Sequence, residues 1–241
     1  MSLEWSARDQ VPVGHGLGGL ADRLPPAIGR PYNAAVDWQA WHDDYDVPDS
    51  RLYRRLLTVQ AHVRRALDSA PQGRLRVVSA CAGQGRDLLD VLAEHPRRED
   101  VTARLVELDP QIAALAERTS EFMGLRGVEV VVGDAGLTRQ YRGMVPADLV
   151  MLCGVFGNIT DQDVERTVAH CPQLCESGAT LIWTRHRRAP DLVPQICRWF
   201  EEQGFERQWL SEPEERWGVG VHRFVGQPSP LAADGRMFTF V

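Results

Sequence analysis

From residue 75 onward, short apolar segments with strand character alternate with segments of helical periodicity, and this alternation constrains the fold more than any other feature. The strand-like segments are 75–81, 102–108, 128–132, 148–153, 179–184, 205–210 and 217–225. Helices are predicted over 87–94, 110–123, 161–175 and 191–203. This alternation predicts an α/β fold with a doubly wound, mainly parallel sheet that is covered by helices on both faces.

The last two strand-like segments, 205–210 and 217–225, are separated by a short connection with no room for a helix. Such a connection cannot make a parallel crossover, so these two strands must pair antiparallel. The sequence therefore predicts a seven-stranded sheet that ends in an antiparallel strand pair. Residues 237–241 are a further candidate for an edge strand.

The chain before the first strand has a different character. Residues 1–30 are rich in glycine and proline, which is typical of an irregular arm. Residues 31–70 have helical periodicity, and either Asp49 or Ser50 would cap the second of two helices. We therefore divide the chain into an N-terminal arm (1–30), a helical cap or lid (31–70) and a sheet domain (71–241).

A glycine-rich segment, 77–89, links the first strand to its helix. Glycines there let the backbone pass close to a ligand, although such a turn alone also serves tight packing in many α/β proteins. Asp109 and Asp134 follow the second and third strands, and Cys153 ends the fourth. Because the carboxyl ends of parallel strands meet at one edge, these residues should converge on one crevice at the switch point of the sheet.

In this arrangement the sequence resembles the class I S-adenosylmethionine (SAM)-dependent methyltransferases, over about residues 75–226. In that family an acidic residue precedes a loop that commonly reads Gly-x-Gly-x-Gly. Here Ser79 stands at the acidic position and Cys81 at the first glycine. The resemblance implies that SAM is the cofactor and S-adenosylhomocysteine the product.

By position, the resemblance assigns the ribose hydroxyls to Asp109, the adenine to Asp134 and the methionine end to the backbone from Ser79 to Gly85. The full set of cofactor residues that it implies is Ser79, Ala80, Cys81, Gly83, Gly85, Asp109, Pro110, Asp134, Ala135 and Cys153.

Other residues are candidates for the acceptor side of the site. His186 follows the fifth strand and could act as a general base, or it is a solvated loop histidine beside arginines. Asn158 could orient an acceptor, or it caps a loop. An aromatic stripe in the cap could form a wall over the substrate or serve packing. The candidate catalytic residues are thus His186 and Asn158, and the candidate substrate residues are Trp38, Trp41, Tyr45, Phe156 and Arg185.

The composition limits the classes of binding partner that we expect for this chain. The formal net charge is −6, and no basic stripe is present, which disfavours a nucleic-acid partner and favours a small-molecule acceptor. The five cysteines lack the spacing of a disulfide framework or a zinc site, so no metal is expected. Neither an apolar stretch of membrane-spanning length nor a signal-peptide core is evident, so we expect a cytoplasmic protein. Whether it forms a homodimer stays open.

Three alternatives stay open. A nicotinamide-dependent oxidoreductase shares the acid after the second strand, but such enzymes normally carry glycine or alanine where Leu88 stands here. An RNA or protein methyltransferase would use the same cofactor on a larger acceptor. A non-catalytic module could bind SAM without turnover.

Overall fold

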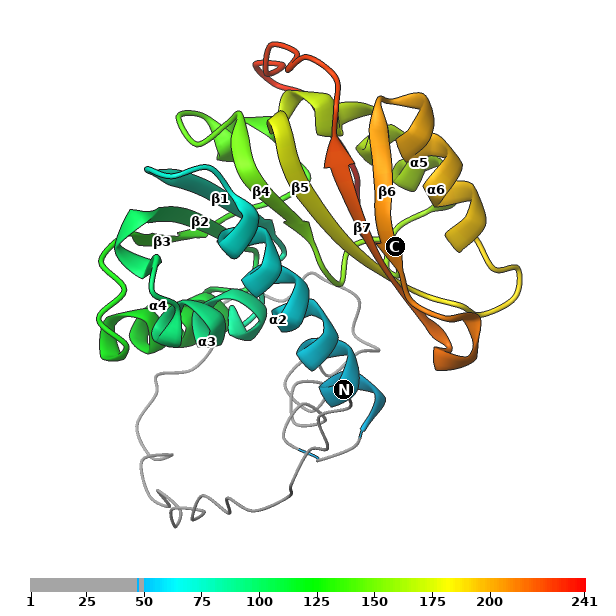
Figure 1. The fold of residues 1–241 in the computed structure, drawn as a ribbon. Coiled ribbons are helices and arrows are strands. Elements are labelled where there is room, and N and C mark those ends of the chain that lie inside the picture. Colours follow the sequence, from blue (N-terminus) through cyan, green and yellow to red (C-terminus); the bar gives the residue numbers. More distant parts are fainter. Residues whose placement is uncertain (1–46, 48–49) are drawn as a thin grey trace, which may run out of the picture. The chain divides into compact units, whose positions relative to one another are not determined.

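The computed structural model describes residues 47 and 50–241. Within them the chain forms three layers, in which a sheet lies between two groups of helices (Figure 1). The predicted arm and the aromatic candidates Trp38, Trp41 and Tyr45 lie outside the described residues.

The sheet has seven strands in the order β3-β2-β1-β4-β5-β7-β6 among the described residues. The strands are β1 (Leu75–Ala80), β2 (Val101–Glu107), β3 (Val128–Val132), β4 (Ala147–Leu152), β5 (Cys175–His186), β6 (Phe205–Leu210) and β7 (Trp217–Phe224). The pairings along the β3-β2-β1-β4-β5 part are parallel, and β7 is antiparallel to both β5 and β6. The predicted fold class is therefore confirmed, and the strand order reverses between β1 and β4.

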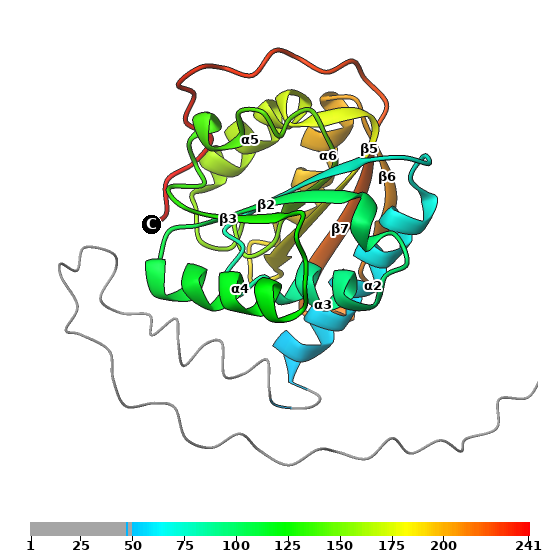
Figure 2. The ribbon, with the colours of Figure 1, turned by 90° about the vertical axis from the view of Figure 1, so that its left-hand side faces the viewer.

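Helices cover both faces of this sheet. They are α2 (Arg51–Ser69), α3 (Arg86–Glu94), α4 (Pro110–Phe122), α5 (Asp161–His170) and α6 (Val193–Glu202). Short 3-10 turns lie at η2 (Arg98–Asp100), η3 (Thr138–Tyr141), η4 (Cys171–Gln173) and η5 (Pro213–Glu215). In Figure 2, α5 and α6 lie on one side of the sheet and α2, α3 and α4 on the other. No helix in the described part of the chain is long and apolar enough to cross a membrane.

Helix α2 is part of the layer that covers the sheet. Its N-cap is Ser50, whose side chain accepts a hydrogen bond from Tyr53 N at 3.0 Å. Its buried residues Val59, Val63 and Leu67 share one hydrophobic core with β1, β2, α3 and α4. The second helix of the predicted cap therefore belongs physically to the sheet domain, and the division at residue 70 does not separate two cores.

Two predicted boundaries are wrong for identifiable reasons. Helix α5 ends at His170, whereas the predicted helix continued to residue 175. The helix stops because Pro172 has no N–H for a helical bond, and the chain passes into η4. Strand β5 begins at Cys175, ahead of the predicted 179–184, since Cys175 pairs with Ala147 across an irregularity in the register.

The chain after β7 returns across the face that carries α5 (Figure 2). Met237 and Phe238 are fully buried there, in the core that α5 and α6 share with the sheet. The predicted edge strand over 237–241 does not form, because these residues bond to loops and helix α5 and not to a sheet edge. The segment makes isolated bridges, which join Leu137 to Arg236 and Ile159 to Phe240.

Candidate functional site

The loop between β1 and α3 has an unusual backbone. Cys81, Gly83 and Gly85 have φ angles of 55°, 58° and 73°, a left-handed region that side chains with a Cβ rarely adopt. Cys81 therefore occupies a position that favours glycine, in agreement with its place at the first glycine of the loop. Gly85 is the N-cap residue directly before α3, and a Cβ there would lie 2.7 Å from Leu105 Cδ2. The loop is fixed in this path by the strands beneath it.

Glu107, the last residue of β2, lies against this loop and was not among the predicted site residues. Its Oε2 accepts a hydrogen bond from Gly83 N at 2.8 Å, and its Oε1 accepts from Asp109 N at 3.0 Å. The prediction ended the second strand one residue later, at 108, and looked for the acid just beyond it. The observed end of β2 makes Glu107 the terminal acid.

Asp109, the acid that the sequence indicated, is the N-cap of α4. Its Oδ1 accepts from Gln111 N at 2.8 Å and from Ile112 N at 3.3 Å, and Pro110 takes the first helical position. Asp109 and Pro110 thus have a sufficient structural explanation as a helix start.

Three neighbouring strand ends meet at Cys81. Burial raises the pKa of its thiol well above the ordinary value, and the charges of Glu107 and Asp134 raise it further. Two carboxylates, from the end of β2 and from the turn after β3, are therefore near enough to this thiol to disfavour its ionised form. The thiol stays protonated at neutral pH and is not an activated nucleophile.

Asp134 is held from two sides. Its Oδ1 accepts from Gly136 N at 2.9 Å, and its Oδ2 forms an ion pair with Arg236 Nη1 at 3.0 Å. The next residue, Ala135, is buried and accepts through its carbonyl from Tyr141 Oη at 2.7 Å. The involvement of Arg236, from the C-terminal segment, has no counterpart in the sequence prediction.

Cys153 lies at the end of β4, on the opposite side of the loop. Its thiol donates a hydrogen bond to the carboxylate of Asp87 in the first turn of α3, and burial raises its pKa well above the ordinary value. The neighbouring Gly154 has a φ of 79°, with open space where a Cβ would point. The end of β4 thus leaves room beside the glycine loop.

The loop after β4 turns inward. Asn158 Nδ2 donates to Gly154 O at 2.7 Å and closes the loop on itself, so the capping interpretation has direct support. Phe156 is fully buried against Trp183, with ring centroids 5.8 Å apart. Arg185 is also buried, and it bonds to the Phe156 carbonyl and pairs with Asp161 at 2.9 Å. Phe156 and Arg185 thus hold the loop in place.

His186 ends β5 beside this loop. Burial lowers the pKa of its imidazole, and the neighbouring charges of Arg185 and Arg188 lower it further, so the ring is neutral at pH 7. Its Nδ1 accepts from Arg188 N at 3.3 Å, which places the ring proton on Nε2. A neutral ring in this tautomer presents a donor, and not a base, at Nε2.

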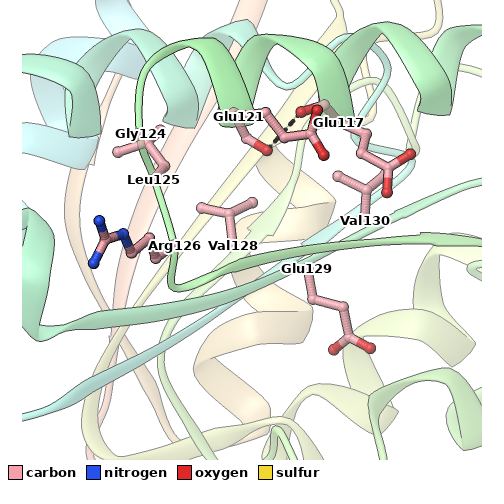
Figure 3. Close-up of a pocket in the computed structure, with 9 residues that line it drawn as sticks. Glu117, Glu121, Gly124, Leu125, Arg126, Val128, Glu129 and Val130 are labelled. Atoms are coloured by element: carbon pink, nitrogen blue, oxygen red, sulfur yellow. Dashed lines mark hydrogen bonds between the residues drawn. The ribbon is translucent and has the colours of Figure 1, made fainter.

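A separate depression lies between α4 and β3 (Figure 3). Its lining includes Glu117, Glu121, Arg126 and Glu129. None of the predicted site residues lines it. The lining comes from the end of α4 and from the start of β3, whereas the candidate residues gather at the carboxyl ends of the strands. We therefore place the candidate site at the loop between β1 and α3.

The strand order, the single antiparallel strand β7 and the loop of positive φ angles between β1 and α3 together define the fold of the class I SAM-dependent methyltransferases.

Solved structures agree with this assignment. An O-methyltransferase family protein from Burkholderia thailandensis is 19% identical, with a TM-score of 0.58 over 78% of this chain and 60% of that one. The CurJ carbon methyltransferase is 14% identical, with a TM-score of 0.60 over 79% and 59%. Magnesium protoporphyrin IX methyltransferase from Synechocystis, solved with S-adenosylhomocysteine, is 12% identical, with a TM-score of 0.59 over 77% and 93%.

The chain thus spans about three fifths of the first two of these proteins. At such identities the likeness concerns the fold. No protein-family model matches the sequence, and no curated protein matches it.

Proposed function

We propose that this protein binds SAM at the carboxyl ends of β1 to β4 and transfers its methyl group to a small-molecule acceptor. The observation that carries the proposal is that the carboxylates of Glu107 and Asp134 lie near Cys81, in a loop with three positive φ angles whose Gly83 N donates to Glu107. Two carboxylates beside a closely approachable backbone suit a ligand that presents ribose hydroxyls and an exocyclic amine.

The residues present fit this cofactor. Glu107 would accept from the ribose hydroxyls, because the carboxylate of Asp109 caps α4. Asp134, shared with Arg236, would accept from the adenine amino group, with Ala135 beside it. The backbone from Ser79 to Gly85 and the wall at Cys153 would face the methionine end. Two buried polar atoms on that side, Ser79 Oγ and Asp87 Oδ1, have no hydrogen-bond partner among the described residues.

When bound, SAM would supply an electrophilic methyl group on its sulfonium, with sulfur keeping the electron pair of the S–C bond in S-adenosylhomocysteine and any proton on the acceptor atom passing to water. The protein's task is then to align the acceptor with the methyl group and to exclude water. His186 would donate a hydrogen bond from Nε2 to the acceptor, since its tautomer leaves Nδ1 occupied. Asn158 would fix the backbone that borders the acceptor.

The size of the acceptor is inferred from charge and from the similar structures. A formal net charge of −6 is unfavourable for binding to the phosphate backbone of a nucleic acid. The similar structures are named for O-methylation, for carbon methylation and for a magnesium porphyrin. These names support a small molecule as the acceptor class, and the methylated atom would be oxygen, nitrogen or carbon.

The first test is thermal unfolding of the full chain with SAM, S-adenosylhomocysteine, NAD and NADP in parallel. A ligand at 100 times its dissociation constant stabilises a protein by about 2.7 kcal/mol, or roughly 5 to 10 °C for this size. We expect this shift with both sulfur ligands and its loss in Glu107→Gln, while Glu202→Gln, at an exposed position of α6, keeps it. A shift with NAD or NADP alone would refute the proposal and favour an oxidoreductase.

The second test is release of S-adenosylhomocysteine over a panel of small acceptors. Turnover is expected on at least one of them. Tight SAM binding without turnover on any acceptor, and without any effect of His186→Phe, would instead indicate a non-catalytic SAM module. Binding of RNA that weakens steeply with salt would point to a nucleic-acid acceptor.

A further inference from the structure

Asp87 carries a buried carboxylate that the fold leaves incompletely paired. It lies in the first turn of α3, two residues after Gly85. One side of the carboxylate accepts from the Cys153 thiol, while the buried Oδ1 has no partner among the residues that the structure describes. A buried acceptor without a partner costs stability, so such an atom calls for an explanation.

A second orphaned atom points to the same place. Ser79 is 1% exposed, and its Oγ also lacks a partner within the described residues. Ser79 is aligned with Met151 of β4, and Cys153 follows Met151 by two positions, so Ser79 and Cys153 project from the same face of the sheet. This face is the one that α2 and α3 cover. Ser79, Asp87 and Cys153 therefore lie around the junction of β1, β4 and α3.

The charged groups that act on the Asp87 carboxylate are Arg55 and Asp90, which have opposite signs. Burial raises the pKa of Asp87 to about 6, while hydrogen bonds from the Cys153 thiol and from its own backbone N–H, and the charge of Arg55 of α2, act in the opposite direction. Asp90, one turn along α3, adds a like charge and is itself bonded by Gln60 Nε2 at 3.1 Å. A cationic ligand would complete this environment, because it would favour the ionised carboxylate.

We propose that Asp87 binds the ammonium group at the amino-acid end of SAM, and that it replaces from α3 the acid that Ser79 lacks at the end of β1. The inference rests on the proposed function. Glu107 and Asp134 would hold the adenosine on the β2 and β3 side of the loop, so the amino-acid end extends toward β4. Asp87 and Cys153 lie on that side, next to the open space at Gly154.

The proposal predicts that one substitution at Asp87 has opposite effects on folding stability and on cofactor affinity. Without a ligand, the raised pKa means that the folded protein disfavours the ionised carboxylate at pH 7. Asp87→Asn should therefore raise the melting temperature of the ligand-free protein while it weakens cofactor binding. A residue that served only to stabilise the fold would show the opposite sign in the first measurement.

The decisive experiment is calorimetry on the full chain with S-adenosylhomocysteine and with 5′-methylthioadenosine, which has the same adenosine but no amino-acid end. At pH 7.5, Asp87→Asn should weaken binding of S-adenosylhomocysteine by about 10- to 100-fold, as expected for loss of one charge-assisted bond. Binding of 5′-methylthioadenosine should change less than about threefold. Asp90→Asn, which removes the neighbouring carboxylate, is the matched control and should leave both affinities within that range.

The pH dependence of binding affinity gives a second measurement. With a pKa near 6, Asp87 is about one quarter ionised at pH 5.5 and nearly fully ionised at pH 7.5. Wild-type protein should thus bind S-adenosylhomocysteine about fourfold more weakly at pH 5.5, relative to 5′-methylthioadenosine, and Asp87→Asn should abolish that difference.

The outcomes distinguish the two proposals. If the wild-type chain binds neither ligand, the proposed function fails. If it binds both and Asp87→Asn weakens them equally, or changes neither, the function stands and the role of Asp87 is refuted.

Discussion

Replacing Glu107 and Asp109 in turn by their amides tests which carboxylate would bind the ribose of the proposed cofactor. Asp109 is the acid that the sequence indicates, whereas Glu107 is the acid that contacts the glycine loop. We predict that Glu107→Gln strongly weakens binding of S-adenosylhomocysteine and that Asp109→Asn does not.

The magnitude follows from the bonds involved. A carboxylate that accepts from both ribose hydroxyls makes two charge-assisted hydrogen bonds, and glutamine keeps one neutral acceptor. We expect a loss of about 2 to 3 kcal/mol, which corresponds to a roughly 30- to 150-fold weaker affinity. Glutamine also loses one of the bonds to Gly83 N and Asp109 N, at a cost of about 1 kcal/mol in folding stability. Asparagine caps helices as well as aspartate does, so Asp109→Asn should change stability and affinity little.

Isothermal titration calorimetry of both variants, beside a melting curve of each ligand-free protein, measures these quantities separately. The expected result is a large loss of affinity in Glu107→Gln and less than a threefold change in Asp109→Asn. If Asp109→Asn weakened binding as much as Glu107→Gln did, the assignment to Glu107 would be refuted and the sequence-based choice restored.

Three further predictions concern the surroundings of the site. Gly85→Ala should destabilise the protein by about 2 to 4 kcal/mol in chemical denaturation, because it adds a Cβ 2.7 Å from Leu105 at a positive φ; no change would mean that the loop is not fixed as described. Arg97→Ala should cost about 2 to 4 kcal/mol by the same assay, since this guanidinium donates to four backbone carbonyls between α2 and β1; a loss below about 1 kcal/mol would show that water replaces them. Arg236→Ala removes a partly exposed ion pair, so stability should change by less than about 1 kcal/mol. The same change frees Asp134 for the adenine and should tighten S-adenosylhomocysteine binding by about two- to fivefold in calorimetry, whereas weaker binding would mean that Arg236 positions Asp134.

The fold was largely predictable because its determinants are local. The strands at 128–132 and 205–210 were predicted with their observed bounds, since the first has four valines in five residues and the second directly follows Gly204, which ends the preceding helix. The antiparallel pairing of β6 and β7 followed from the short connection between them alone. Patterns of this kind depend on neighbours a few residues apart, which a sequence displays.

The site was less predictable because it depends on contacts between distant residues. Arg236 and Asp134 are 102 positions apart, and no periodicity links them. The inward turn of the loop after β4, which buries Phe156 and Arg185, depends on how Trp183 and Asp161 are packed. Glu107 was missed for a local reason: two acids flank one residue, and the bounds of β2 decide which of them ends the strand.

Several departures from ordinary local rules lie at the carboxyl end of β1. Cys81 and Arg216 are the residues other than glycine with positive φ in the described part of the chain, and Arg216 closes a surface turn. Two of the orphaned buried polar atoms, on Ser79 and Asp87, flank the same loop as Cys81. Strain and unpaired groups persist in a folded protein where the surrounding structure enforces them, and they cluster at binding sites. The strained backbone, the buried carboxylate of Asp87 and the unpaired hydroxyl of Ser79 lie around one loop, and each is unfavourable for folding alone. A bound cationic cofactor would account for the carboxylate and the hydroxyl.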